Sequence, residues 1–314
     1  MRAIKECINP RRYWPRVELN KIMSTRSWLH KEWPKTIVLI EQLRQDEKGN
    51  NIFVSIGTGF ITEHENFNIL ITCKHVVFDS EQKTFLPNLF ASFNQKDGTL
   101  GRRSLETLKK ELKIDWFFHK DPKVDLAIMP FGIDPEKDDI KRMGKDLYEK
   151  IEELAEGEEI FFLGFPALGI KMEKNIRPIV RSGIIALIQE DKTFLIDANV
   201  FPGNSGSPVF LKPSMMDFQT NTLGQIRPAK FIGIINSYLP YYDIAISPQT
   251  KRPRIVFEEN SGLANVYSIS FIDDIFNSEE FKKKIEELKP KVAENKEKNL
   301  PPSSAEPSNP PKAD

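Results

Sequence analysis

Ser205 is the residue of this chain whose surroundings most suggest covalent chemistry. It lies in FPGNSGSPVF, residues 201–210, with Gly203 two positions before it and Gly206 directly after it. A serine hydroxyl becomes a nucleophile when a nearby base takes its proton and backbone N–H groups hold the oxyanion that forms. The same letters also occur in polar turns between strands, so the rest of the chain has to decide between the two interpretations.

The order of histidine, acid and serine along the chain separates the known arrangements for serine acyl transfer. All four histidines precede Ser205, whereas an α/β-hydrolase has its histidine after the serine. Ser207 also stands where that fold has the second glycine of G-x-S-x-G. The subtilisin order would require a helix beginning at the serine, but GSPVFL has the pattern of a strand. The remaining arrangement is His, then Asp, then Ser on paired β-barrels.

His75 is the predicted base, because it ends the strongly apolar strand NILITCKHVV, and a barrel presents such a side chain at its rim. The other histidines lie in an irregular arm, a polar turn and a loop-bound strand: His30, His64 and His119. Asp125 is the predicted orienting acid, since it opens the apolar strand VDLAIMPF. The remaining candidate acids lie in more polar, turn-like surroundings: Asp115, Asp121 and Asp134. In this assignment Ser205 attacks a carbonyl, His75 accepts and returns the proton, and Asp125 holds the imidazole.

The backbone N–H groups of Gly203 and Ser205 form the predicted oxyanion hole. A peptide turned toward the crevice often needs a dihedral angle that only glycine adopts easily, which accounts for glycine at 203. Losing one such donor typically costs about 2.7–4 kcal/mol of transition-state stabilisation.

Two series of short β-rich runs predict an all-β fold of two tandem, six-stranded antiparallel barrels. The first barrel covers about residues 36–131 and the second about residues 158–275. Between them, DPEKDDIKRMGKDLYEKIEELAEG has apolar residues close to helical spacing, which predicts a linker helix over about 135–156. A C-terminal helix is expected over 278–289, followed by a Pro/Ser/Lys-rich tail, residues 290–314, whose composition is typical of disorder.

Residues 1–34 form an irregular, basic and aromatic arm ahead of the predicted barrel domain, residues 35–277. We expect the aromatic side chains of this arm to pack on the domain. The alternative is that the arm mediates homo-oligomerisation or binds a partner protein.

The composition is that of a soluble globular protein. Lys plus Arg equals Asp plus Glu at 45 each, and this zero net charge gives no support to nucleic-acid binding. No segment approaches the ~18 consecutive apolar residues of a membrane span, and the N-terminus lacks the apolar run of ~7–15 residues of a signal peptide. With only two cysteines, Cys7 and Cys73, we expect a cytoplasmic protein.

No metal or cofactor is expected, because the sequence contains neither H-E-x-x-H nor paired C-x-x-C motifs. Cys73 lies two residues from His75, and we interpret it as a small buried apolar residue rather than a thiol switch.

Several segments, in the right order over about residues 50–275, resemble the trypsin-like serine peptidases, and most closely their HtrA/Deg-type branch. GTGFIT is similar to the early strand of that branch, ITCKHVV to its T-x-x-H-V strand end, and VDLAIMPF to its D-L-A-V-L strand. GEEIFFLGFPALG and VRSGIIALI resemble paired strands of the second barrel, DANVFPGNSGSPVF the nucleophile segment, and FIGIINSYL the strand beside the substrate. The resemblance implies a serine endopeptidase of the chymotrypsin fold that uses His75, Asp125 and Ser205.

The chain also departs from the family's pattern. Asn204 stands where digestive trypsin-like enzymes have an aspartate that pairs with a newly cleaved N-terminus, so activation by zymogen cleavage is not expected. Ser207 replaces the more usual second glycine after the nucleophile. No PDZ domain is expected after the second barrel, so regulation that depends on that domain is not carried over.

The resemblance also suggests substrate contacts. Asn199, six residues before Ser205, occupies the pocket-base position and is neutral, which disfavours Lys or Arg and favours small or aliphatic residues before the cleaved bond. Asn236, Ser237 and Tyr238 would line the strand that pairs with an extended peptide, and Tyr238 is predicted to narrow the pocket.

Two other functions stay open. A catalytically silent or partner-activated module of the same fold would bind extended peptides, although all three triad candidates are present. A maturation or signalling component would keep the chemistry but cleave a single partner, and indifference to casein would distinguish it from a general protease.

Overall fold

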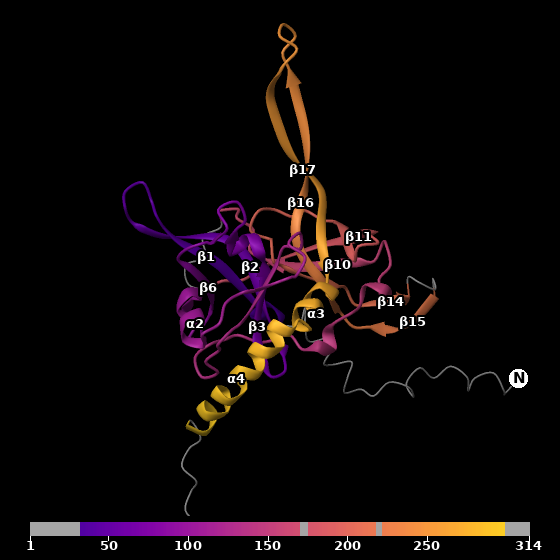
Figure 1. Cartoon of the computed structure of the whole chain (residues 1–314). Coiled ribbons are helices and arrows are strands. Elements are labelled where there is room, and N and C mark those ends of the chain that lie inside the picture. The colour runs from indigo at the N-terminus through magenta and orange to yellow at the C-terminus, as the bar shows by residue number, and fades with distance from the viewer. Residues whose placement is uncertain (1–31, 170–174, 218–221, 299–314) are drawn as a thin grey trace, which may run out of the picture.

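The computed structural model describes residues 32–169, 175–217 and 222–298 of the 314-residue chain (Figure 1). Most of the predicted N-terminal arm and the last part of the predicted tail, residues 299–314, lie outside the described residues. Trp33 is the one aromatic residue of the arm among the described residues, and its ring lies 4.8 Å from the Phe210 ring and 5.6 Å from the Phe161 ring, centroid to centroid.

The first β unit is a seven-stranded sheet with the order β7-β6-β1-β2-β3-β9-β8. Its strands are β1 (Ile37–Gln45), β2 (Asn51–His64), β3 (Phe67–Cys73), β6 (Leu89–Asn94), β7 (Leu100–Ser104), β8 (Phe117–Phe118) and β9 (Leu126–Pro130). Among the described residues β7 and β8 do not pair, so this sheet is not the closed six-stranded barrel that the sequence predicts. A short two-stranded sheet of β4 (Phe78–Asp79) and β5 (Thr84–Phe85) follows the turn after β3.

The second β unit is the predicted closed six-stranded barrel, with the order β10-β11-β12-β17-β16-β13. Its strands are β10 (Glu159–Gly164), β11 (Ile179–Ile188), β12 (Thr193–Asp197), β13 (Pro208–Leu211), β16 (Lys230–Ile246) and β17 (Pro253–Ser268). Strands β14 (Ser214–Asp217) and β15 (Thr222–Arg227) form a separate two-stranded sheet. Fold class is therefore as predicted: an all-β protein with few helices.

Strands β10 and β13 and the first part of β16 are buried on both faces, which explains their nearly continuous apolar runs. Because successive side chains of a strand point to opposite faces, Phe162 lies in the barrel interior while Phe161 lies in the core that joins the two β units. Phe231 of β16 also belongs to the joining core, and its ring packs edge-to-face on Phe60 of β2 at 5.3 Å. The two units therefore share one continuous apolar interface.

The predicted linker helix over 135–156 is wrong. This segment contains only two single-turn 3₁₀ helices, η3 (Lys145–Leu147) and η4 (Ile151–Glu153). The backbone of Met143 exchanges hydrogen bonds with β2, and the Glu149 N–H donates to the Phe231 carbonyl of β16 at 2.9 Å. Hydrogen bonds to both β units thus replace the helical ones, while the apolar side chains at helical spacing are still largely buried.

The helices also differ from the prediction. An unpredicted helix, α2 (Leu105–Leu112), begins where the Ser104 hydroxyl accepts a hydrogen bond from the Thr107 N–H, as an N-cap does. At the C-terminus α3 (Ser270–Phe276) precedes α4 (Glu279–Lys298), so the helix predicted over 278–289 continues into the segment predicted to be disordered. The remaining 3₁₀ turns are η1 (Trp33–Thr36) and η2 (Lys74–Val76). No helix in the described ranges is both long and apolar enough to cross a membrane.

Candidate active site

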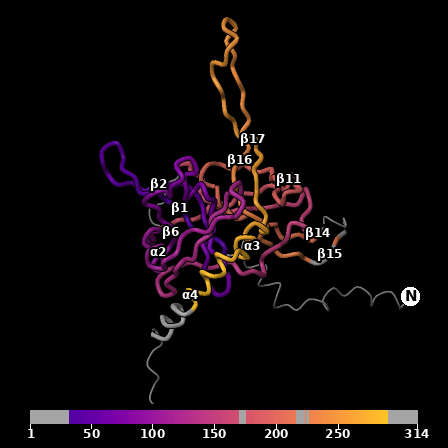
Figure 2. The backbone as a smooth tube through the Cα atoms, in the orientation of Figure 1, coloured from indigo at the N-terminus to yellow at the C-terminus, as the bar shows by residue number. Residues whose placement is uncertain are grey.

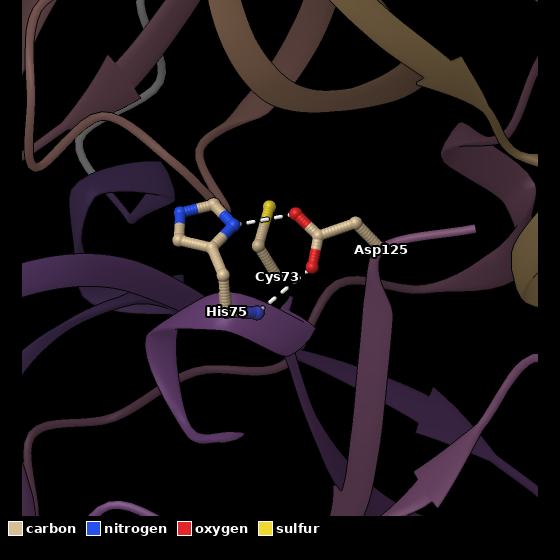
Figure 3. Close-up of side chains that lie close together, drawn as sticks. All are labelled: Cys73, His75 and Asp125. Atoms are coloured by element: carbon tan, nitrogen blue, oxygen red, sulfur yellow. Dashed lines mark hydrogen bonds and ion pairs between the residues drawn. The ribbon is translucent and has the colours of Figure 1, made fainter. Parts of the chain in front are cut away.

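His75 and Asp125 lie together because β3 and β9 pair in antiparallel register. Cys73, the last residue of β3, is opposite Leu126, the first residue of β9. The turn η2 that follows Cys73 and the residue that precedes Leu126 therefore lie at the same end of the strand pair. Figure 3 shows the result, with the imidazole ring of His75 directed at the Asp125 carboxylate.

The carboxylate of Asp125 accepts two hydrogen bonds from His75. The distance from His75 Nδ1 to Asp125 Oδ2 is 2.5 Å, and that from the His75 backbone nitrogen to Asp125 Oδ1 is 2.8 Å. Since a carboxylate only accepts, Nδ1 carries the proton, and the other ring nitrogen, Nε2, is left to act as a base. The His75 side chain is 49% exposed and that of Asp125 is 22% exposed, so the base faces solvent while the acid is more sheltered.

The backbone of Asp125 is held by a tyrosine that the sequence analysis did not single out. The Asp125 N–H donates to the Tyr267 hydroxyl at 3.2 Å, and that hydroxyl donates to the Lys123 carbonyl at 3.3 Å. Burial raises the pKa of Tyr267, so its hydroxyl stays protonated and keeps both roles. The sequence around Tyr267 gives no sign of this contact, because Tyr267 lies 142 residues from Asp125 along the chain.

Ser205 lies in the loop between β12 and β13, and this loop is hydrogen-bonded to the first β unit. The Thr58 N–H donates to the Ser205 carbonyl at 2.9 Å. The Gly206 N–H donates to the Ile235 carbonyl at 2.8 Å, and the Cys73 thiol lies 3.2 Å from the same oxygen. The structure therefore brings the residue after Ser205 next to the strand end that carries His75. Within the described residues no hydrogen bond joins Ser205 Oγ to the His75 ring.

Thr58 of β2 connects the serine loop to both β units. Its hydroxyl donates to the Gly203 carbonyl at 2.7 Å and accepts from the Phe165 N–H at 2.9 Å. Its carbonyl accepts from the Thr72 hydroxyl at 2.7 Å. Thr58 was missed as an individual residue, although it lies within the quoted segment GTGFIT, between two glycines.

The N–H groups of the serine loop divide into two sets. Those of Asn204, Gly206 and Ser207 donate to backbone carbonyls. Among the described residues, the N–H groups of Gly203 and Ser205, the predicted oxyanion donors, make no hydrogen bond. Unpaired donors of this kind are available to an incoming acceptor such as a carbonyl oxygen.

Gly203 has the positive φ expected of a turned peptide. Its φ is +92°, and a Cβ atom there would lie 2.5 Å from the Phe165 carbonyl oxygen and 2.8 Å from the Ala167 nitrogen. Both neighbours are backbone atoms, which move at high cost. Glycine is therefore required at 203 for its dihedral angle and for its lack of a side chain.

Two polar side chains beside the nucleophile are buried without a hydrogen-bond partner in the described chain, Asn204 and Ser207. They lie against Gly164, where a Cβ would approach Ser207 Oγ to 2.0 Å and Asn204 Oδ1 to 2.8 Å. Both groups are neutral, so their burial costs less than that of a carboxylate at the same positions.

The residues predicted to bind substrate lie in two parts of the second β unit. Asn199 is exposed just beyond the end of β12, and Asn236, Ser237 and Tyr238 are half-buried on β16. Asn236 is tied to the pair of His75 and Asp125, because its Nδ2 donates to the Tyr267 hydroxyl at 3.4 Å. The Tyr238 hydroxyl instead donates to Glu258 of β17 at 2.5 Å, away from that network.

The ligand atoms of Cys73, His75 and Asp125 lie within 4.8 Å of one another, which raises the question of a metal site. A metal requires a thiolate, but burial raises the pKa of the Cys73 thiol well above its ordinary value. The S–H group is also within reach of the Ile235 carbonyl, and Nδ1 of His75 is already bonded to Asp125. The donor set therefore fits hydrogen bonding better than metal coordination.

A closed six-stranded barrel packed on a second β unit, with a His–Asp pair at a strand end near a glycine-rich serine loop, defines a protein with the chymotrypsin architecture. A protein-family model described as a trypsin-like peptidase domain matches residues 57–213, half of the chain. The chain belongs to this family. His75, Asp125 and Ser205 all lie inside the matched range, whereas β16, β17 and the C-terminal helices lie beyond it. No curated protein matches the chain.

Proposed function

We propose that the protein is a serine endopeptidase that cleaves peptide bonds through Ser205, His75 and Asp125. The observation that carries this proposal is the pair of hydrogen bonds from His75 to the Asp125 carboxylate, which engages Nδ1 and leaves Nε2 as the ring nitrogen available to a substrate-side partner. A structural role alone would not require an exposed imidazole held in one tautomer beside a glycine-rich serine loop.

Acylation follows from these roles. Ser205 Oγ forms a bond to the carbonyl carbon of the substrate while its proton passes to His75 Nε2, and the carbonyl oxygen becomes an oxyanion. The unpaired N–H groups of Gly203 and Ser205 donate to that oxyanion. The C–N bond then breaks as Nε2 returns the proton to the leaving amine, and the acyl group stays on Ser205 as an ester.

Deacylation repeats the sequence with water. His75 Nε2 takes a proton from a water molecule whose oxygen attacks the ester carbonyl. The C–Oγ bond breaks, the proton returns to Ser205, and the carboxylic acid leaves. Asp125 stays ionised throughout and stabilises the imidazolium that forms in each half of the reaction.

The proposal extends to specificity. The neutral Asn199 supports a preference for small or aliphatic residues before the cleaved bond, and Asn236, Ser237 and Tyr238 offer the strand that would pair with the substrate. Membership of the HtrA/Deg-type branch and a cytoplasmic location belong to this proposal as well, since both rest on sequence patterns alone.

A partner-activated module of the same fold is the second candidate. The observation that favours it is the missing hydrogen bond between Ser205 Oγ and His75 in the described chain. In that case a bound peptide or partner would complete the alignment of the triad before any bond is cleaved.

A fluorescent fluorophosphonate tests the proposal, because it phosphonylates only a serine activated by a base and an oxyanion hole. The full-length protein is compared with Ser205→Ala and, as a matched control, with Ser247→Ala, which changes a serine in the turn between β16 and β17. We expect labelling of the natural protein and the control but not of Ser205→Ala, with the adduct mass located on the peptide that contains Ser205.

Labelling of all three proteins would place the nucleophile elsewhere and refute the assignment. If none is labelled although all are folded, the probe is repeated with unfolded casein present. Labelling that now depends on Ser205 would support the partner-activated form, and its continued absence would refute both.

A further inference from the structure

The strands β16 and β17 continue far beyond the barrel as a two-stranded ribbon. β16 pairs with β13 only up to Ile234, and β17 pairs with β12 only up to Leu263. Beyond these points the two strands pair with each other, ending with Ile246 opposite Pro253. Figures 1 and 2 show this hairpin standing away from the rest of the molecule. We call residues 240–259 the ribbon.

The ribbon exposes large apolar side chains on both of its faces. Each is between 48% and 59% exposed: Tyr241, Tyr242, Ile244, Ile246, Ile255, Val256 and Phe257. An isolated two-stranded ribbon is at best marginally stable in water, and contiguous apolar surface of this kind marks an interaction site. The ribbon therefore has the composition of strands that are completed by another chain.

The outer edge of β17 has a charge pattern that complements itself. The segment Arg254-Ile255-Val256-Phe257-Glu258 begins with a cation, ends with an anion and has three apolar residues between them. When two copies of this segment pair antiparallel about Val256, Arg254 of each copy stands opposite Glu258 of the other. The same register places Ile255 opposite Phe257 and Val256 opposite its own copy, so every cross-strand pair is favourable.

The other edge of the ribbon lacks this property. On β16 the corresponding stretch carries a single charge, Asp243, with no cation to face it between Pro240 and Ile246. The β17 edge is also limited in length, because Pro253 has no N–H to donate to a neighbouring strand. A short, self-complementary edge favours a symmetric dimer, in which the two edges cover each other, over an assembly that keeps adding strands.

We propose that the β17 edge, Arg254–Glu258, pairs antiparallel with the same edge of a second copy of this chain. The two ribbons then form one four-stranded sheet with the order β16-β17-β17-β16. This inference uses no residue of the triad, although Glu258 also accepts a hydrogen bond from Tyr238, a proposed substrate-binding residue.

Sedimentation velocity over a concentration series of the full-length protein tests the pairing. Arg254→Glu and Glu258→Arg are each expected to weaken dimerisation about tenfold or more, because both symmetric pairs change from attraction to repulsion. The double variant Arg254→Glu/Glu258→Arg restores the opposite charges and is expected to dimerise like the natural protein. Lys251→Glu, the same charge reversal in the hairpin turn, is the matched control and is expected to change nothing.

The ribbon lies outside the core, so all variants should keep the natural circular dichroism spectrum. A natural protein that stays monomeric at every concentration would overturn the proposal. So would a dimer that tolerates both single reversals, or a double variant that fails to recover. A monomer that instead binds an extended apolar peptide through the ribbon would assign the surface to a different partner.

Discussion

Asp125 accepts hydrogen bonds from His75 at two points, the ring nitrogen Nδ1 at 2.5 Å and the backbone N–H at 2.8 Å. The backbone bond fixes where the carboxylate lies relative to the turn η2, and the ring bond fixes both the orientation and the tautomer of the imidazole. One carboxylate therefore prepares the base that the proposed chemistry needs.

Asp125→Asn should lower the rate of peptide hydrolysis or fluorophosphonate labelling by about 10⁴-fold. An amide can donate as well as accept, so it stabilises the tautomer with the proton on Nε2 and removes the base. Asp121→Asn, an exposed carboxylate four residues earlier, is the control and should keep the natural rate. A normal rate in Asp125→Asn would contradict the role of this residue.

Thr58→Val should slow labelling of Ser205 and destabilise the fold by about 1–3 kcal/mol. Valine has nearly the same shape, but it leaves the Gly203 carbonyl and the Phe165 N–H without the partner that they share. Thr58→Ser keeps the hydroxyl and should retain most of the rate. If valine and serine behave alike in urea unfolding and in labelling, the hydroxyl does not position the loop.

Gly203→Ala should reduce the labelling rate about 10²–10³-fold, as loss of one oxyanion donor does. The added methyl group would meet the Phe165 carbonyl at 2.5 Å and displace the loop that carries Ser205. Gly157→Ala is the matched control, since Gly157 has a φ of +87° but no atom within 4 Å of the added Cβ. An equal loss of activity in both variants would mean that backbone strain alone is responsible.

His64 should make the protein less stable as the pH falls from about 6.5 to about 4. Burial against Phe276 and Phe281, together with the nearby Lys145, Lys282 and Lys289, lowers the pKa of His64 to about 4, although Glu65 opposes this shift. In this pH range the unfolded chain binds a proton that the folded protein does not, so the free energy of unfolding decreases.

The measurement is the urea midpoint of the natural protein and of His64→Phe between pH 7.5 and 4.5. All other titrating groups contribute to both proteins, so the difference between the two curves isolates His64. The natural protein should lose more stability than the variant on acidification. Parallel curves would show that His64 does not titrate in this way.

Much of the site was predictable from the sequence because its signals are local. Ser205 is surrounded by glycines, His75 ends an apolar strand, Asp125 opens another, and their order along the chain excludes the competing serine folds. The alternating and continuous apolar runs likewise predict strands, since each depends only on which faces of a strand are buried.

Features that depend on contacts between residues distant in sequence were decided only by the tertiary structure. The segment 135–156 has helical spacing, yet it forms only two 3₁₀ turns, because its backbone is hydrogen-bonded to β2 and β16. Thr58 and Tyr267 hold the site through contacts with residues more than 100 positions away, which no local pattern reveals. The sequence by itself determined the β class and indicated the residues that we propose for the chemistry. Strand pairing, which joins distant segments by backbone hydrogen bonds, decided how the first sheet is arranged and which groups hold the serine loop. It also leaves the outer edge of the ribbon part of β17 without a partner strand among the described residues.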